Sequence, residues 1–283
     1  MRIIERITEM QQAAEGWRGE GKRIALVPTM GYLHEGHLQL MQAVRPHSDV
    51  LVISIFVNPA QFGPGEDFER YPRDLDRDIH LATETGVDFA FVPQVGEMYP
   101  EGYQTFVNVT EVTGPLCGQS RPAFFRGVTT VVTKLFNIVK PHTSIFGEKD
   151  FQQLVTIRRM VMDLNMDIEI IGHPIVREQD GVAMSSRNAY LTPEQRRKAV
   201  RLNHSLREAH ALVQGGERTG AIILKKVREV IAEGDDVRID YARLCDPANL
   251  QEVSRITGPT LLALAVHVGV ARLIDNSVLN PST

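Results

Sequence analysis

The stretch RIALVPTMGYLHEGHLQLM, residues 23–41, carries the pattern that decides the fold. Its first part, RIALVPT (23–29), is a short apolar run typical of a buried strand. The residues after it recur at helical spacing, namely His37, Leu40, Met41 and Val44. The next apolar run, VLVISIFV (50–57), is typical of a central strand in a parallel sheet. The order strand, helix, strand predicts a βαβ unit.

The same alternation continues on both sides of this unit. We expect an amphipathic helix along Ile3, Ile7, Met10, Ala14 and Trp17, further helices at 74–86, 127–140 and 151–165, and strands at 87–93, 142–146 and 167–172. GEKD (147–150) is expected to form a turn in which Asp150 caps the next helix and Gln153 is its capping partner. The first 175 residues therefore predict a doubly wound, Rossmann-like parallel sheet, whose ligands lie at the carboxyl ends of the strands.

The pattern changes after residue 175. Thr192, Pro193 and Gln195 predict a well-formed helix start, and a second helix is expected at about 219–233. Three strands are expected near 237–244, 260–267 and 270–275. Residues 176–283 therefore predict a smaller α+β domain with an antiparallel sheet.

Composition excludes several classes of protein. The 283 residues carry 31 Lys plus Arg against 35 Asp plus Glu, a formal charge of −4, which is too balanced for a protein that binds duplex nucleic acid. Cys117 and Cys245 have no disulfide or zinc spacing, so we expect a reducing, cytoplasmic location. The apolar run 261–274 is too short to cross a bilayer, so no membrane partner is expected.

MGYLHEGH (30–37) places two histidines one helical turn apart, where a strand gives way to a helix. Unpaired backbone N–H groups and the helix dipole make such a position an anion site, and Gly36 allows a flat group to approach the backbone. Two alternatives stay open: one histidine caps the helix while the other packs, or both bind zinc. The zinc alternative is weaker, because HExxH motifs separate the histidines by four positions.

Three later stretches also carry candidate ligand-binding residues. Two of them follow expected strands of the parallel sheet, and the third lies at the start of the second domain. FVNPAQFGPGEDFERYPRD (56–74) is either a substrate loop carrying amides such as Gln61 or a plain surface loop. Lys149 follows another strand and is the best single candidate for neutralising phosphate oxygens. GVAMSSRNAYL (181–191) has the composition of a mobile phosphate clamp, or of a linker with a serine turn.

HEGH (34–37) and AMSSR (183–187) together resemble the paired HIGH and KMSKS signatures of adenylate-forming nucleotidyltransferases. Ala183 and Ser186 stand at the two lysine positions of the second signature, so the resemblance implies that Arg187 and Lys149 supply the charge. PTMGYLHEGH, FVNPAQF, YPRD, GEKDFQQL and DGVAMSSRNAYL, in this order, are similar to the pantothenate synthetase family over nearly the whole chain.

The resemblance implies ATP-dependent ligation of pantoate and β-alanine to pantothenate, with release of AMP and pyrophosphate through a pantoyl-adenylate intermediate. It implies Mg²⁺ as a cofactor and a homodimer joined through the N-terminal domain. Residues 1–175 would then be the domain that binds ATP and pantoate, and residues 176–283 the domain that carries the clamp loop.

By position in these motifs, the resemblance implies catalytic roles for His34, His37, Lys149 and Arg187. The implied ATP contacts are Met30, Gly31, Tyr32, Leu33, His34, Glu35, Gly36, His37, Gly147, Glu148, Lys149, Asp150, Val176, Met184, Ser185, Ser186 and Arg187. The implied substrate contacts are Gln61 for pantoate and β-alanine, Gln153 for pantoate, and Asn58, Tyr71 and Arg121. The resemblance does not identify the residues that would bind Mg²⁺.

Three other functions compete with this one. A cytidylyltransferase or another nucleotidyltransferase of the same fold would transfer the nucleotide and stop. A metal-dependent hydrolase would use His34, His37 and a carboxylate around zinc. A nucleotide-binding module without catalysis is disfavoured, because it would need neither the substrate loop (56–74) nor the clamp loop (181–191).

Overall fold

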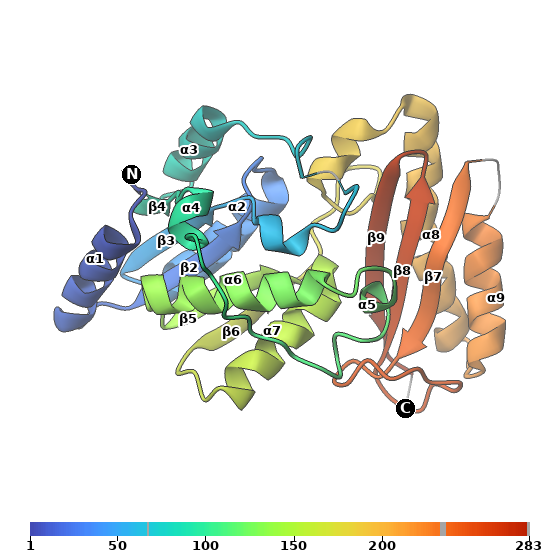
Figure 1. The fold of residues 1–283 in the computed structure, drawn as a ribbon. Helices are drawn as coiled ribbons and strands as arrows, with labels where there is room; N and C mark the ends of the chain where they lie inside the picture. Colours follow the sequence, from blue (N-terminus) through green and yellow to red (C-terminus); the bar gives the residue numbers. More distant parts are fainter. Residues whose placement is uncertain (67, 233–235, 282–283) are drawn as a thin grey trace. The chain divides into compact units, whose positions relative to one another are not determined.

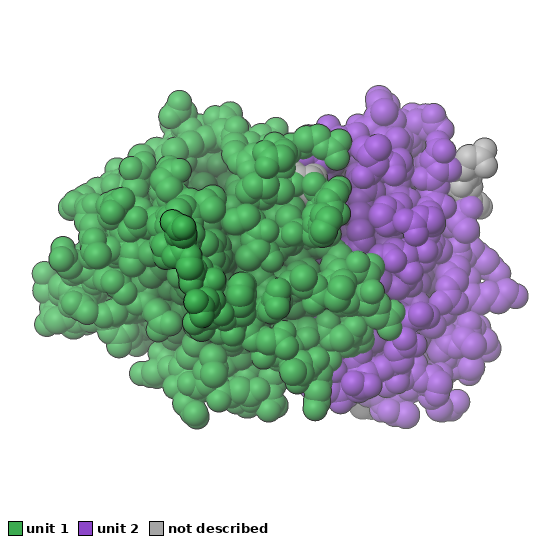
Figure 2. All heavy atoms as spheres, viewed as in Figure 1, with its two compact units in different colours: residues 1–148, 153–174 green, residues 149–152, 175–283 purple. Residues whose placement is uncertain are grey.

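The computed structural model describes residues 1–66, 68–232 and 236–281. Its contacts divide the chain into two compact units, which Figure 2 shows in different colours. Unit 1 consists of Met1–Glu148 and Gln153–Pro174, and unit 2 of Lys149–Gln152 and Ile175–Thr283. The short segment with Lys149 thus belongs by its contacts to unit 2, although its neighbours in sequence belong to unit 1.

Unit 1 is built on a six-stranded parallel sheet in the order β1-β4-β3-β2-β5-β6 (Figure 1). The strands are β1 (Arg2–Ile4), β2 (Ile24–Thr29), β3 (Val50–Ile55), β4 (Phe89–Phe91), β5 (Thr143–Gly147) and β6 (Glu169–His173). The order reverses between β2 and β5, and in doubly wound sheets this switch point is where ligands bind. The predicted fold class is confirmed.

Helices cover both faces of this sheet. They are α1 (Ile7–Gly19), α2 (Glu35–Val44), α3 (Leu75–Glu84), α4 (Val95–Met98), α5 (Cys117–Ser120), α6 (Phe124–Val139) and α7 (Phe151–Asp163), with the 3₁₀ turns η1 (Arg45–His47), η2 (Pro59–Gln61) and η3 (Glu148–Asp150). Consecutive residues of β2 are buried in the two hydrophobic cores on opposite faces of the sheet. Leu26 packs with Met10 and Val132, and Val27 packs with Met41 and Ala82. A strand buried on both faces explains the continuous apolar runs in the sequence.

The start of the chain differs from the prediction. Arg2–Ile4 forms the edge strand β1, which pairs with β4 in the register Ile4 to Phe91, and the helix begins only at Ile7. Ile4 is buried, whereas Ile3 is 43% exposed. A strand of three residues is too short to show an alternation of apolar and polar residues, and it is a strand only because it pairs with β4, far along the chain. The helical spacing between Ile3 and Ile7 therefore predicted the wrong structure for Arg2–Ile4. GEKD forms the predicted turn, as the 3₁₀ turn Glu148–Asp150.

Unit 2 contains an antiparallel sheet in the order β7-β8-β9. Its elements are η4 (Ser186–Tyr190), α8 (Pro193–Gln214), α9 (Gly220–Ile231), β7 (Val237–Cys245), β8 (Thr260–Val268) and β9 (Ala271–Leu279). Leu202 and Leu206 of α8 and Ile223 of α9 share one core with Leu264 of β8. The predicted helix start is confirmed, because Thr192 and Gln195 form a capping box with bonds of 3.0 and 3.2 Å.

Candidate active site

The turn after β2 is shaped by residues in left-handed conformations. Gly31 has a φ of +80° and Tyr32 a φ of +51°. A β-carbon on Gly31 would lie 2.9 Å from Asp78 Oδ2 and 3.0 Å from a methyl carbon of Ile55. Thr29 accepts a bond from the Gly31 N–H at 3.2 Å and donates to the Ser54 carbonyl of β3 at 2.8 Å. Glycine is therefore needed at position 31 for conformation and for space.

A buried carboxylate holds this turn from the neighbouring helix α3. Asp78 is 1% exposed and accepts bonds from the Tyr32 and Leu33 N–H groups, each at 2.7 Å. Arg77 donates to the Leu33 carbonyl at 2.9 Å, so successive residues of α3 hold both polar groups of Leu33. Burial raises the pKa of the Asp78 carboxyl, although the two backbone N–H bonds oppose this.

The two histidines form the first turn of α2. His34 is the extended N-cap residue and His37 occupies the third helical position, so that the two residues form a capping box. His37 Nδ1 accepts the His34 N–H at 3.3 Å. The rings stack with centroids 4.0 Å apart and planes inclined by 28°. The alternative in which the histidines cap the helix is therefore observed. The capping bond uses Nδ1 of His37 and does not involve its Nε2.

Asn58, a predicted substrate contact, lies buried in the loop that follows β3. It is 1% exposed, its Nδ2 donates to Gln61 Oε1 and to the Gly127 carbonyl at 3.1 Å each, and its Oδ1 accepts the Tyr99 hydroxyl at 2.8 Å. Gln61 Nε2 lies 3.0 Å from the Met30 sulfur. The amide of Gln61 is thereby oriented, with its oxygen held by Asn58 and its N–H₂ directed toward the β2–α2 turn.

Tyr71 and Arg121 are also held within unit 1. Arg121 pairs with Glu66, with Nε to Oε1 at 2.7 Å, and it donates to the Gln61 carbonyl at 3.1 Å. Its guanidinium lies 3.9 Å from the centre of the Phe124 ring. Tyr71 is 5% exposed and meets Phe62 edge-on at 6.0 Å between ring centres. Arg121 thus binds Gln61 and Glu66, and Tyr71 packs against Phe62, all among the described residues that follow β3.

The remaining predicted residues of unit 1 lie at strand or helix ends. Glu35 and Gly36 begin α2, with Glu35 exposed. Gly147 ends β5 and Glu148 begins η3. Gln153 lies half-buried in the first turn of α7.

Unit 2 holds Lys149 and the predicted clamp loop. Lys149 Nζ lies 3.5 Å from Asp150 Oδ2. The loop folds back on itself, because Met184 N–H donates to the Val176 carbonyl at 2.9 Å and Gly181, with a φ of +93°, makes the bend. Ser185 caps η4 by accepting the Arg187 N–H at 3.3 Å.

The base of this loop is fixed by ion pairs. Arg196 of α8 binds Glu178 and Asp180, with closest approaches of 2.7 and 2.6 Å. The hydrogen bond from Arg196 lowers the pKa of the Asp180 carboxyl. Asn188 donates to Glu178 Oε1 at 2.6 Å and to the Ala183 carbonyl at 3.0 Å. The half-buried segment Met184–Arg187 therefore follows directly after a braced hairpin.

Three residues with structural roles near the candidate site were not predicted from the sequence, namely Asp78 and Arg77 of α3 and Asn276 of β9. Asp78 had a detectable signal: in the predicted amphipathic helix it lies one turn before Ala82, and these two residues form the buried face of the helix. An acid in a buried stripe needs hydrogen-bond donors, and these were the N–H groups of the turn.

Within the described residues, no group of three or more His, Cys, Asp and Glu side chains could hold a metal ion. Over the same residues, no helix has both the length and the apolar character needed to span a membrane.

A doubly wound sheet with a capped, glycine-containing turn at its switch point is typical of nucleotide-binding α/β proteins. The family model of pantoate-beta-alanine ligase matches residues 2–278. The chain belongs to the pantoate–β-alanine ligase family. The predicted family and enzyme class are therefore confirmed, and neither a metal-dependent hydrolase nor a non-catalytic module is supported.

Individual relatives agree with this assignment. The pantothenate synthetase of Syntrophobacter fumaroxidans is 68% identical over 282 residues, which is 100% of both chains, and that of Desulfatibacillum aliphaticivorans is 59% identical over 99% of this chain and 100% of its own. A pantothenate synthetase structure from Thermus thermophilus has a TM-score of 0.94 at 44% identity, covering 99% of this chain and 100% of its own. A pantoate-beta-alanine ligase structure from Francisella tularensis, described as complexed with beta-gamma ATP and beta-alanine, has a TM-score of 0.81 at 31% identity over 98% and 97% of the two chains.

Proposed function

We propose that this chain joins pantoate to β-alanine in two steps driven by ATP. A pantoate carboxylate oxygen attacks the α-phosphorus, the bond from that phosphorus to the bridging oxygen breaks, and pyrophosphate leaves. The amine of β-alanine then attacks the acyl carbon of pantoyl adenylate, AMP leaves with the bonding electrons, and the amine loses a proton. Membership of the family supports this reaction, and the capped start of α2 is the structural observation that carries its first step.

The β2–α2 turn is assigned to the phosphates. In a neutral imidazole, a ring nitrogen that accepts a hydrogen bond leaves the proton on the other nitrogen. Because His37 Nδ1 accepts the His34 N–H, the neutral ring carries its proton on Nε2. His37 is therefore proposed as a hydrogen-bond donor to phosphate oxygen, assisted by the helix N-terminus. The other contacts assigned to ATP here are Met30, Gly31, Tyr32, Leu33, His34, Glu35 and Gly36.

Lys149 and Arg187 are proposed to neutralise the charge that develops as pyrophosphate departs. Preorganised donors of this kind typically change rates by about 10² to 10³ each. Gly147, Glu148, Asp150, Val176, Met184, Ser185 and Ser186 are assigned to ATP as neighbours of these two cations. Arg187 follows the capped Ser185, so a fixed turn precedes its side chain.

Gln61 and Gln153 are proposed to hold pantoate, with Gln61 also close to β-alanine. Because Asn58 holds the oxygen of the Gln61 amide, the N–H₂ group is the part offered to a carboxylate or hydroxyl oxygen. Asn58, Tyr71 and Arg121 then act by holding the loop that carries Gln61.

Mg²⁺ is proposed to enter with the nucleotide. Magnesium is commonly held by substrate phosphates and one or two carboxylates, so a cluster of protein ligands is not required. Asp150, beside Lys149, has the right chemistry for such a carboxylate. Bound Mg²⁺ would supply further charge neutralisation at the phosphates.

A cytoplasmic homodimer joined through residues 1–175 completes the proposal. Cys117 and Cys245 are both free thiols, which supports a reducing compartment. Sedimentation of the purified protein and of a variant altered on unit 1 tests the dimer.

Pyrophosphate exchange tests the reaction. We expect labelled pyrophosphate to enter ATP only when pantoate is present, and AMP to appear only when β-alanine is added. A panel of other hydroxy acids tests selectivity, and Lys149→Ala should slow the exchange by about 10² to 10³. Exchange that needs no pantoate, or nucleotide transfer without AMP release, would favour another nucleotidyltransferase.

A further inference from the structure

Two polar residues are buried side by side in β9. Asp275 is 2% exposed and Asn276 is 6% exposed, so the alternation of buried and half-buried residues along the strand breaks at this pair. Neighbouring residues of a strand point to opposite faces of its sheet. A carboxylate and a carboxamide at such positions require hydrogen-bond partners. Their partners lie in the two segments of unit 2 that carry the candidate phosphate ligands.

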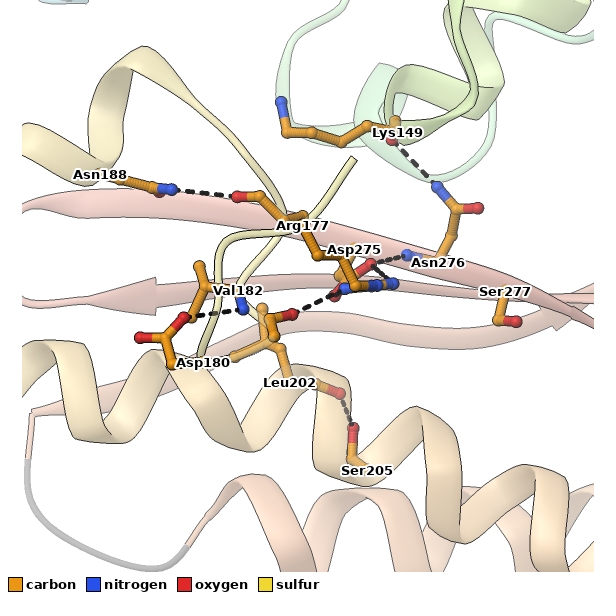
Figure 3. Close-up of polar contacts among 12 residues, drawn as sticks. Lys149, Arg177, Asp180, Val182, Asn188, Leu202, Ser205, Asp275, Asn276 and Ser277 are labelled. Atoms are coloured by element: carbon orange, nitrogen blue, oxygen red, sulfur yellow. Dashed lines mark hydrogen bonds and ion pairs between the residues drawn. The ribbon is translucent and has the colours of Figure 1, made fainter. Parts of the chain in front are cut away.

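Asp275 anchors the base of the clamp loop. Its two oxygens accept from Arg177 at 2.7 and 2.9 Å, and Oδ1 also accepts the backbone N–H of Asn276 at 2.8 Å. Arg177 further donates to the Gly181 carbonyl at 3.1 Å. Figure 3 shows Arg177 and Asp275 facing each other beside the bend that leads to Asn188. One carboxylate thus fixes both the loop base and the backbone of Asn276.

Asn276 anchors the other segment. Its Nδ2 donates to the Lys149 carbonyl at 3.0 Å, although the two residues are 127 positions apart. In Figure 3 the Asn276 amide points to this carbonyl, while the lysine side chain extends away from it. The bond therefore holds the backbone from which the ammonium projects.

We propose that Asn276 is a positioning residue for Lys149. The proposal rests on the function assigned above, in which Lys149 stabilises the departure of pyrophosphate. A lysine side chain has four rotatable bonds, so its ammonium is placed well only if its backbone is fixed. A displacement of about 1 Å at a reacting group can cost on the order of 10² in rate. Asp275 supports this role by holding the Asn276 N–H and, through Arg177, the loop that leads to Arg187.

The alternative is that Asn276 only stabilises the fold. The two roles differ in which chemical step they affect. A positioning role through Lys149 changes adenylate formation and leaves the attack of β-alanine on preformed pantoyl adenylate unchanged. A purely structural role lowers thermal stability and either leaves both steps intact or slows both together.

The experiment measures both half-reactions in Asn276→Ala and Asn276→Asp, alone and combined with Lys149→Ala. Asn280→Ala is the matched control, because Asn280 is exposed and the bond that it accepts from Gln214 goes to its backbone carbonyl, which alanine keeps. We expect Asn276→Ala to slow pyrophosphate exchange by roughly tenfold or more. We expect no slowing of the second half-reaction, and no further slowing of exchange in the Lys149→Ala background.

The proposal would be overturned if Asn276→Ala slowed pyrophosphate exchange by the same factor in the wild type and in the Lys149→Ala background. It would also be overturned if Asn276→Ala slowed both half-reactions equally, or slowed neither. If the alanine variant does not fold, the nearly isosteric aspartate variant gives the same comparison, since it also lacks the donor. Failure of the underlying function looks different: Lys149→Ala by itself would then leave exchange unchanged.

Discussion

The Asp78 carboxylate accepts a hydrogen bond from the Leu33 backbone N–H across 2.7 Å, although 45 positions separate the two residues. A second bond of 2.7 Å, from Tyr32, makes this side chain the brace of a turn that contains two left-handed residues. The conformation of the candidate phosphate loop therefore depends on a helix outside the motif.

Asp78→Asn should disturb this loop. One of the two backbone N–H groups would then face an amide N–H₂, and a buried donor without an acceptor costs about 1–3 kcal/mol. We expect a loss of unfolding free energy of that size in chemical denaturation, together with a raised KM for ATP. Asp76→Asn, on the exposed side of the same helix, should change the stability by less than about 0.5 kcal/mol. A normal KM for ATP in Asp78→Asn would show that the loop holds its shape without the brace.

Two variants of His37 separate its capping role from its proposed role at phosphate. Glutamate is the usual third-position partner of a capping box, so His37→Glu keeps an acceptor for the His34 N–H and places a negative charge near the helix N-terminus, where it is favourable. We expect its melting temperature to stay close to that of the wild type. His37→Ala loses the bond from the His34 N–H, which is one half of the capping box, at a cost of up to about 1 kcal/mol.

Both His37 variants should nevertheless lose most pyrophosphate exchange, by about 10² or more, because neither offers an imidazole N–H to the phosphate. Calorimetry measures the stability and the exchange assay measures the function. Near-normal exchange in His37→Glu would limit His37 to capping the helix.

Gly127 of α6 should be essential for the loop that carries Gln61. A β-carbon at this position would lie 2.1 Å from the Ala60 carbonyl oxygen and 2.6 Å from the Gln61 nitrogen. Gly127→Ala must therefore push η2 away, and overpacking of this kind costs about 1–3 kcal/mol. If Gln61 binds pantoate, steady-state kinetics should show a larger rise in KM for pantoate than for ATP.

The control for this variant is Gly16→Ala in α1, where a β-carbon meets nothing within 4 Å. Alanine should stabilise that helix by about 0.5–1 kcal/mol without changing either KM. Equal KM values for pantoate in Gly127→Ala and the wild type would argue against the assigned role of Gln61.

The sequence predicted those features that depend on a few neighbouring residues. The buried strand before His34, the helix after it and the Thr192–Gln195 capping box are set by local spacing, and all three are present. The brace from Asp78 and the bond from Asn276 to Lys149 join residues 45 or more positions apart. No local pattern encodes such pairs, since they arise only when the sheets bring distant segments together. The strand Arg2–Ile4 was missed for the same reason.

The stability of the protein should fall as the pH drops below neutrality, and His142 should contribute to this fall. Burial lowers the pKa of His142 below its ordinary value of 6.5, and the nearby charges of Arg18 and Arg23 act in the same direction, against Asp167. Its Nδ1 accepts the Ile24 N–H at 3.0 Å, at the start of β2. Between the folded and unfolded pKa values the unfolded chain binds more protons. The stabilisation is therefore complete above pH 6.5 and is lost as the pH falls through the folded pKa.

His142→Asn isolates this contribution, because an amide oxygen can accept the Ile24 N–H and does not titrate. We expect urea unfolding curves of the variant to show a weaker dependence of unfolding free energy on pH below about 6.5. The slope that one histidine can contribute is at most about 1.4 kcal/mol per pH unit. Burial also lowers the pKa values of His210 and His267, so the variant should keep part of the dependence. A variant whose slope equals that of the wild type would show that His142 does not change its proton affinity on folding.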